Sequence, residues 1–143
     1  MADLVGKVLL YGDGKHDRVN LPVASATAIV KGEFVCWEAG YITKMDAASD
    51  DATFVGVSEM DHAANAGIVN LTVITKCVVL APATTASYSF GAALKYNTGG
   101  YLEAAGGADT IAHAWEDNGT TSITSLKVMV DTYHLGKLFL VSA

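Results

Sequence analysis

The chain has 143 residues, of which 51% are hydrophobic and only 17% are charged, and its formal net charge is −6 at pH 7. This length suits a single domain that buries roughly 70% of its unfolded surface without help from disulfides. The negative charge and the scattered single Lys and Arg residues exclude nucleic acid as the main partner, because phosphate binding needs clustered basic side chains.

Short apolar and β-branched segments alternate along the chain with clusters of Gly, Asn, Asp and Ser, a pattern typical of an all-β protein. Helix signals are weak, and only 46–51 and 83–87 have the composition of a brief helical turn. We predict strands, in chain order, at 5–11, 19–23, 33–38, 41–45, 53–60, 68–80, 92–96, 101–104, 110–116, 122–131 and 138–141. Short antiparallel strands at this spacing indicate a compact β-barrel or sandwich.

One phrase of sequence occurs twice. GEFVCWEAGYI at 32–42 and GAALKYNTGGYL at 91–102 share a leading Gly, apolar positions and a Gly-Tyr-aliphatic end. Two further pairs of segments continue the likeness, which are FVGVSE (54–59) with IAHAWE (111–116) and NLTVIT (70–75) with SLKVMV (125–130). We interpret the chain as two similar β-units, at about 29–75 and 88–130, that share one closed core.

The first 18 residues lie outside the repeat and form a predicted N-terminal arm, whereas 19–143 form a single β domain. The segment 4–11 is apolar and is followed by a flexible GDG turn. Two interpretations stay open, an edge strand of the barrel or an extended arm that adds to the sheet edge of a neighbouring chain. Several strands are apolar on both faces, as in VVLAP (78–82), so a second sheet or a neighbouring subunit must cover them.

No group of residues has the pattern of a catalytic site. The four histidines are His16, His62, His113 and His134, and no frame such as GxSxG surrounds a Ser. Glu59 and Glu116 are interpreted as matching structural or rim residues at the ends of the repeated strands, and not as the acid pair of a glycosidase. We therefore predict no catalytic residue and no enzymatic activity.

Metal and cofactor patterns are equally weak. SDDAT (49–53) lacks the spacing of a calcium loop, and neither GDG (12–14) nor TGG (98–100) precedes a helix that would bind a phosphate. Cys36 and Cys77 lack metal-ligand spacing and are predicted to be reduced, semi-buried thiols. The sequence therefore predicts no metal and no cofactor, and it shows neither a signal peptide nor a membrane span.

The aromatic residues cluster at the strand ends of the repeat, where core or interface packing is more common than a carbohydrate platform. The low share of charged residues also favours contact with other chains, although an Ala-rich core gives the same composition. We expect partner contacts from the apolar arm and the two tryptophans, namely Leu4, Val5, Val8, Leu9, Leu10, Tyr11, Trp37 and Trp115.

The run LPVASATAIVKGEFVCWEAGYITKMDAASDDATFVGVSE (21–59) resembles the capsid cement, or head decoration, proteins of tailed double-stranded DNA phages. The matching pieces are AIVKGEFV (28–35), GYI (40–42), AS (48–49) and FVGVS (54–58), with GAAL (91–94) and GGYLEAA (99–105) similar to the second half of that group. The chain departs from the group at His113, where Gly is more common, and in its longer C-terminal tail ending KLFLVSA.

This resemblance implies a non-enzymatic protein that docks on the outside of the assembled capsid, binds the major capsid protein and stabilises the shell. It also implies a homotrimer that is made in the host bacterial cytoplasm and ends up on the outer surface of the virion. Neither nucleic acid nor a membrane is an expected partner. Two alternatives stay open: another virion part, such as a tail-tube or head-fibre protein, and a carbohydrate-binding β module that uses Trp37, Trp115 and the tyrosines.

Overall fold

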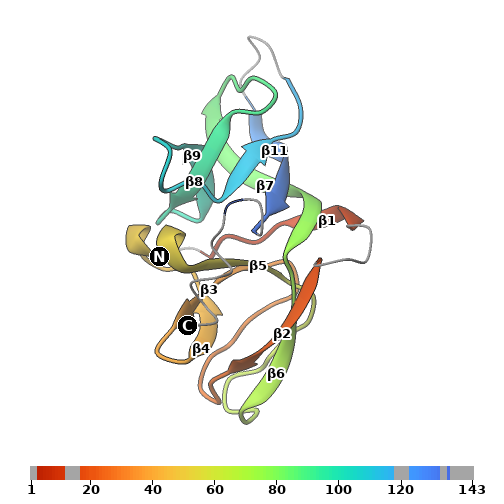
Figure 1. The fold of residues 1–143 in the computed structure, drawn as a ribbon, viewed down its shortest axis with the longest axis vertical. Coiled ribbons are helices and arrows are strands. Elements are labelled where there is room, and N and C mark those ends of the chain that lie inside the picture. The colour runs from red at the N-terminus through yellow and green to blue at the C-terminus, as the bar shows by residue number, and fades with distance from the viewer. Residues whose placement is uncertain (1–2, 12–16, 118–122, 133–134, 136–143) are drawn as a thin grey trace.

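A computed structural model of the chain describes residues 3–11, 17–117, 123–132 and 135. Apart from one short 3-10 helix, all regular elements of this part of the chain are strands, which confirms the predicted all-β class (Figure 1). The elements are β1 Lys7–Tyr11, β2 Arg18–Val23, β3 Phe34–Glu38, β4 Tyr41–Lys44, η1 Ala48–Thr53, β5 Phe54–Ser58, β6 Val69–Ile74, β7 Lys76–Ala86, β8 Ala93–Asn97, β9 Tyr101–Ala104, β10 Ala112–Ala114 and β11 Ile123–Asp131. None of the described residues forms a helix that is long and apolar enough to cross a membrane.

The strands close into two barrels that follow one another along the long axis of the molecule (Figure 1). The first barrel has the strand order β2-β4-β3-β5-β6. The second has the order β7-β11-β10-β8-β9 and closes through the pairing of β7 with β9, while β1 extends its sheet beside β7. The two predicted units are therefore present, but each closes a barrel of its own, and the expectation that they share one closed core is corrected.

The two barrels have the same strand connections. In each barrel the first strand runs antiparallel to the last strand and parallel to the third. The parallel pairs that close the barrels are Val23 with Ile42 and Ala83 with Leu102. Ile42 and Leu102 are the aliphatic residues of the repeated Gly-Tyr-aliphatic phrase, so the repeat marks the place where each barrel closes.

The glycines of the repeated phrase have a conformational reason. Gly32 and Gly91 have φ values of +90° and +87°, and Gly40 and Gly100 have +87° and +89°. Residues other than glycine rarely adopt this part of backbone space, because a Cβ would clash with the backbone. The turn before each of the hairpins β3–β4 and β8–β9, and the turn that joins its two strands, therefore require the glycines that the two copies share.

The prolines extend the repeat further than predicted from the sequence. The chain has two prolines, and Pro22 and Pro82 each precede the residue that makes the parallel closing pair. Proline has no amide hydrogen to donate, so it is tolerated only where a strand lacks a regular ladder bond on that side. The structural units consequently begin with β2 and β7, upstream of the boundaries at 29 and 88 expected from the sequence.

The barrels meet through strands that are buried on both faces. The inward side of β3 and β5 places Val35 and Val55 in the interior of the first barrel. The other side places Phe34 and Phe54 in a larger cluster that continues into the second barrel, for example to Leu94. The Phe34 and Phe54 rings stack with their centroids 5.9 Å apart. For β3 and β5 the cover thus comes from the second barrel of the same chain, whereas Leu80 of the segment 78–82 remains exposed.

The segment 68–80, predicted as one strand, is two strands that are separated at Thr75. The Thr75 amide donates to the Asp17 carbonyl at 2.8 Å, and its carbonyl accepts from the Thr132 amide at 2.9 Å. The chain passes from one barrel to the other at this residue, which interrupts the ladder. The helical turn expected near 83–87 is wrong because β7 continues to Ala86, whereas the turn expected at 46–51 is confirmed by η1. The strand predicted at 138–141 lies outside the described residues.

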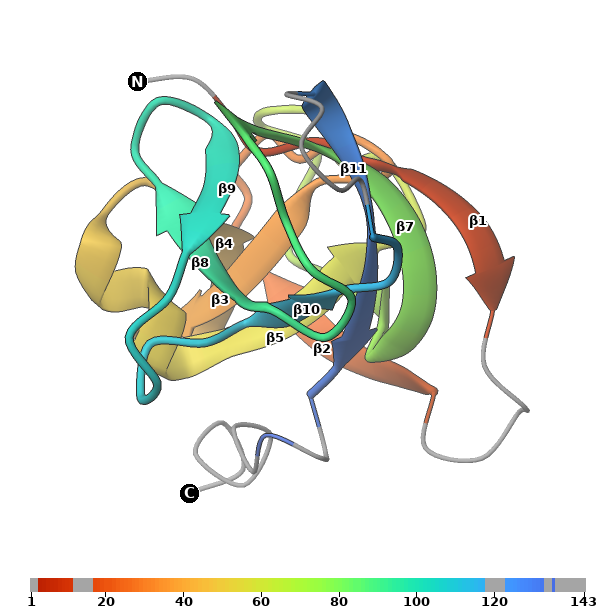
Figure 2. The same cartoon turned by 90° about the horizontal axis from the view of Figure 1, so that it is seen from above.

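The N-terminal segment lies against its own chain (Figure 2). Leu4 is only 1% exposed, and its carbonyl accepts the Phe34 amide at 2.9 Å. Val5 forms a β-bridge with Glu33, and β1 pairs antiparallel with β7. Of the two interpretations left open by the sequence, the structure contains the edge strand. The GDG turn at 12–14 lies outside the described residues.

Candidate interaction surface

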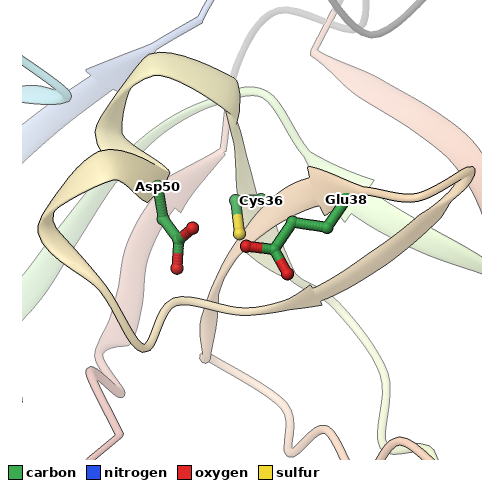
Figure 3. A group of neighbouring side chains, drawn as sticks. All are labelled: Cys36, Glu38 and Asp50. Atoms are coloured by element: carbon green, nitrogen blue, oxygen red, sulfur yellow. The ribbon is translucent and has the colours of Figure 1, made fainter.

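Among the described residues, one group has the composition of a metal site: Cys36, Glu38 and Asp50, whose potential ligand atoms lie within 4.8 Å of one another (Figure 3). Cys36 and Glu38 come from β3, and Asp50 comes from η1. The Asp50 carboxylate accepts the backbone amides of Asp46 and Ala47 at 2.9 and 3.0 Å, which begin the helical turn. This carboxylate therefore already has a structural role in the fold.

The protonation states of this group also favour a structural role. The hydrogen bond that the Glu38 carboxyl donates to Asp50 raises the pKa of Glu38 to about 7, and burial adds to that shift. Although burial acts in the opposite sense, hydrogen bonds from Glu38, Asp46 and Ala47 hold the pKa of Asp50 below its usual value. Burial raises the pKa of the Cys36 thiol far above its ordinary value, and the thiolate is the form that binds metals and attacks electrophiles. We interpret the group as a carboxyl–carboxylate pair beside an inert thiol.

The structure describes two of the four histidines, His62 and His113. His62 is buried, and its two ring nitrogens lie 2.6 Å from the Thr27 carbonyl and 2.8 Å from the Gly67 carbonyl. Both nitrogens are thus used to join two loops of the first barrel. His113 lies in β10, paired in register with Met129 and Ala93. His16 and His134 lie outside the described residues.

The outer side of the second barrel presents a group of exposed apolar side chains, which we call the apolar face. In register across the sheet, Leu10 of β1 lies opposite Val78 of β7, which lies opposite Met129 of β11. The Trp115 and Phe90 rings pack together with their centroids 4.9 Å apart and are 39% and 58% exposed. The set comprises five exposed side chains, Leu10, Tyr11, Leu80, Phe90 and Trp115, and two half-buried ones, Val78 and Met129.

A shallow groove of about 300 Å³ crosses the apolar face. Strand alternation explains it: successive side chains of β7 and β11 point into the barrel and away from it. The lining residues are Leu10, Tyr11, Lys76, Cys77, Val78, Trp115 and Met129. A register shift between Val8 and Leu10 brings the β1 side chain opposite Val78. The groove therefore depends on β1, which only the second barrel has.

The predicted partner contacts separate into three groups. Leu4 is buried in the core of its own chain, so it is not exposed to a partner in this structure, and Val5 and Val8 are half-buried. Trp37 packs against the core of the first barrel and is half-buried. The remaining four are exposed and belong to β1 or to the segment after β10, and they are Leu9, Leu10, Tyr11 and Trp115. The structure thus brings three of them, Leu10, Tyr11 and Trp115, to one groove.

Sequence reasoning missed Val78, Phe90 and Met129. Val78 and Met129 could have been predicted from the sequence, because β7 and β11 are apolar on both faces while only one face can fill a barrel. Phe90 had none, since it is a single aromatic residue in a loop. Of the aromatic residues considered for a carbohydrate platform, Tyr96 is only 1% exposed and belongs to the core.

The proposed match of Glu59 with Glu116 is corrected by one residue. The Glu59 amide donates to the Thr72 carbonyl, and in the second barrel it is the Trp115 amide that donates to Lys127. The position of Glu59 therefore corresponds to Trp115. Glu59 accepts the Arg18 guanidinium at 3.0 Å, whereas Glu116 accepts the Lys127 amide at 2.6 Å, so the two carboxylates have different local roles.

The described residues thus form two packed barrels with an exposed apolar face on the second, and the polar clusters described above serve the fold. Comparison of the chain with protein-family models and with curated proteins gives no match. The apolar face is the feature of this surface that best fits an interaction site, because exposed aromatic and aliphatic groups of this kind are typical of protein contacts.

Proposed function

We propose that this protein is a structural binding protein that docks on another protein through the apolar face of its second barrel, and that it decorates and cements the capsid of a tailed phage. The apolar face is the observation that carries the binding role. The sequence resemblance of 21–59 to capsid cement proteins supports the capsid as the surface to which it binds. In this proposal the major capsid protein is the partner, and the outer surface of the virion is the location.

The stabilisation of a capsid by a bound protein follows from the linkage between binding and assembly. A protein that binds the assembled lattice, and not the separated subunits, stabilises the lattice by its free energy of binding. The two barrels suit such a task because a continuous cluster of buried residues packs one against the other. We propose that three copies assemble as a homotrimer, which would let one particle contact several capsid subunits.

The direct test is retention on capsids. We expect the purified protein to sediment with expanded heads that lack their decoration protein and to raise the temperature at which those heads break open. The double substitution Phe90→Ser with Trp115→Ser should abolish retention, because it removes the exposed ring pair of the apolar face. The control is Met60→Ser with Ile68→Ser, which removes exposed apolar side chains from the first barrel and should leave retention unchanged. No sedimentation of the wild-type protein with heads would contradict the proposed function.

Two other functions predict different outcomes. A tail-tube or head-fibre protein would form hexameric rings or filaments, which light scattering after size-exclusion chromatography separates from a trimer. A carbohydrate-binding module would give a glycan-array signal that Trp115→Ala removes, since Trp115 is the exposed tryptophan of the apolar face.

A further inference from the structure

Four of the seven described basic residues form no ion pair, and three of these lie around the apolar face, whereas the fourth is Lys31. The basic residues that form ion pairs are Arg18, Lys44 and Lys95, with nitrogen–oxygen distances of 3.0 to 3.9 Å to carboxylates. Within the described part of the chain, Lys7, Lys76 and Lys127 have no such carboxylate. The charges of these three lysines are not engaged by a carboxylate of the described chain, so they are free to meet a partner of opposite charge.

These three lysines flank the apolar band. Lys7 and Lys127 lie in register on either side of Leu80, one row from the band of Leu10, Val78 and Met129. On the other side of the band, Lys76 occupies the next outward-facing position of β7, and it lines the groove. Cationic side chains therefore border the apolar band along both of its long sides.

The three lysines outnumber the two acidic groups beside them, while Arg18, which lies against Tyr11, is already paired with Asp17 and Glu59. Asp131 lies opposite Lys76 in the ladder, and the Glu116 carboxylate accepts the Lys127 backbone amide. The main acidic group of the first barrel, around η1, lies on the opposite side of the molecule from β1 (Figures 1 and 2). The lysines beside β1 and β7 are thus well separated from the acidic group around η1.

From this arrangement we infer that the apolar face docks an acidic segment of a partner protein, which places an aliphatic or aromatic side chain in the groove and carboxylates against Lys7, Lys76 and Lys127. Charge complementarity at an interface fixes the register of the partner and excludes basic surfaces. The groove of about 300 Å³ has room for one such side chain, and its floor is apolar. The inference deepens the proposed function, since it gives the chemistry of the capsid surface that this face would meet.

Other occupants fit the face less well. A two-fold dimer through this face would bring the lysines of one copy towards those of the other, and like charges in contact cost binding energy. An anionic membrane is normally bound by clusters of about four to eight basic residues, more than this face carries. Nucleic acid is disfavoured for the same reason.

The test uses two synthetic peptides, EDLFEDL and its charge-reversed counterpart KKLFKKL, titrated into isotope-labelled full-length protein. We expect the acidic peptide to shift the amide signals of Val78 and Met129 and the Trp115 indole signal in a saturable manner, and the basic peptide to leave them in place. The substitutions Lys76→Glu and Lys127→Glu together should weaken binding at least about tenfold. The matched control, Lys44→Glu with Lys95→Glu, changes the net charge by the same amount away from this face and should stay within about twofold of wild type.

Several results would overturn the inference: no shift with either peptide, equal shifts with both, or equal affinity of the two double variants. Sedimentation with vesicles containing about 30% anionic lipid in place of peptide binding would assign the face to a membrane, and a dimer that protects the Trp115 indole would assign it to a second copy. Head binding separates this inference from the proposed function. If heads retain the Lys76→Glu, Lys127→Glu variant as well as wild type, the acidic partner is wrong and the function stands. If the acidic peptide binds but heads retain nothing, the reverse holds.

Discussion

The two barrels have the same connections but different surroundings. In the first barrel, β3 and β5 are buried on both faces, since one face fills the barrel and the other packs towards the second barrel. In the second barrel, the outward side of β7 and β11 remains accessible and carries the apolar face. The second barrel alone is extended by an added strand, β1.

This difference teaches that the barrel topology does not by itself define a binding site. The closing residues, glycines and prolines occur in both copies, so they are requirements of the fold. What distinguishes the second barrel is the added β1 strand and the exposed pair of Phe90 and Trp115. A functional surface is thus built from the parts that the two copies do not share.

The largest difference between the barrels should come from two equivalent glycines. A Cβ at Gly32 would lie 2.2 Å from the Gly6 carbonyl oxygen, whereas a Cβ at Gly91 would meet nothing within 4 Å. We expect Gly91→Ala to cost about 1 kcal/mol for its positive φ alone, and Gly32→Ala to cost about 3 kcal/mol because it also displaces the N-terminal segment. Urea unfolding measures both values. Equal losses would show that the segment before β1 does not pack on the first barrel.

Two leucines test whether the N-terminal segment belongs to the core. Leu4 is 1% exposed and Leu10 is 55% exposed. Leu4→Ala should lower the free energy of unfolding by about 3 kcal/mol, since it leaves a cavity in the cluster shared by the barrels. Leu10→Ala should change it by less than about 0.5 kcal/mol. Thermal melts of both variants provide the comparison, and a stable Leu4→Ala protein would mean that the segment is detached in solution.

A buried carboxyl gives the first barrel a pH dependence at a position where the second barrel has an alanine. Glu33 is buried with one carboxyl oxygen unpartnered, and burial raises its pKa to about 7, while the equivalent residue of the second barrel is Ala92. The folded state therefore binds the Glu33 proton more tightly than the unfolded state. The contribution of Glu33 to the free energy of unfolding is complete below about pH 4.5 and is lost as the pH rises through about 7. Glu33→Gln should raise stability by about 2 kcal/mol at pH 8 and change it little at pH 4. Parallel stability–pH curves for the two proteins would contradict this assignment.

The smallest effects should come from the surface ion pairs of the two barrels. Arg18 pairs with Asp17 and Glu59 and lies 5.0 Å from the Tyr11 ring centroid, and Lys95 pairs with Glu103 and Asp109. Lys95→Ala should shift the melting temperature by less than about 2 °C, because exposed pairs are screened by water. Arg18→Ala should have a somewhat larger effect, since it also loses the ring contact. A larger shift for Lys95→Ala would reverse the ranking of the two networks.

The strands and the repeat could be predicted from the sequence because both depend on local chemistry. Alternation of apolar residues placed most strands within one or two residues of their observed ends, as at 101–104. The division of 68–80 was missed because the same β-branched pattern continues through Thr75, and only the change of barrel interrupts it. The candidate site was predicted in part: Leu10, Tyr11 and Trp115 line the groove, whereas Leu4 is buried.

The sequence by itself determined that the chain is all β, that it is built from two similar units, and which glycines its turns need. These properties follow from contacts between near neighbours, which a linear pattern records. Only the tertiary structure decided that each unit closes its own barrel, that the N-terminal segment packs on its own chain, and that Phe90 joins Trp115 beside β1. The reason is that barrel closure and face-to-face burial depend on which residues meet across a long loop, and the same alternating strand can fill an interior or face a partner.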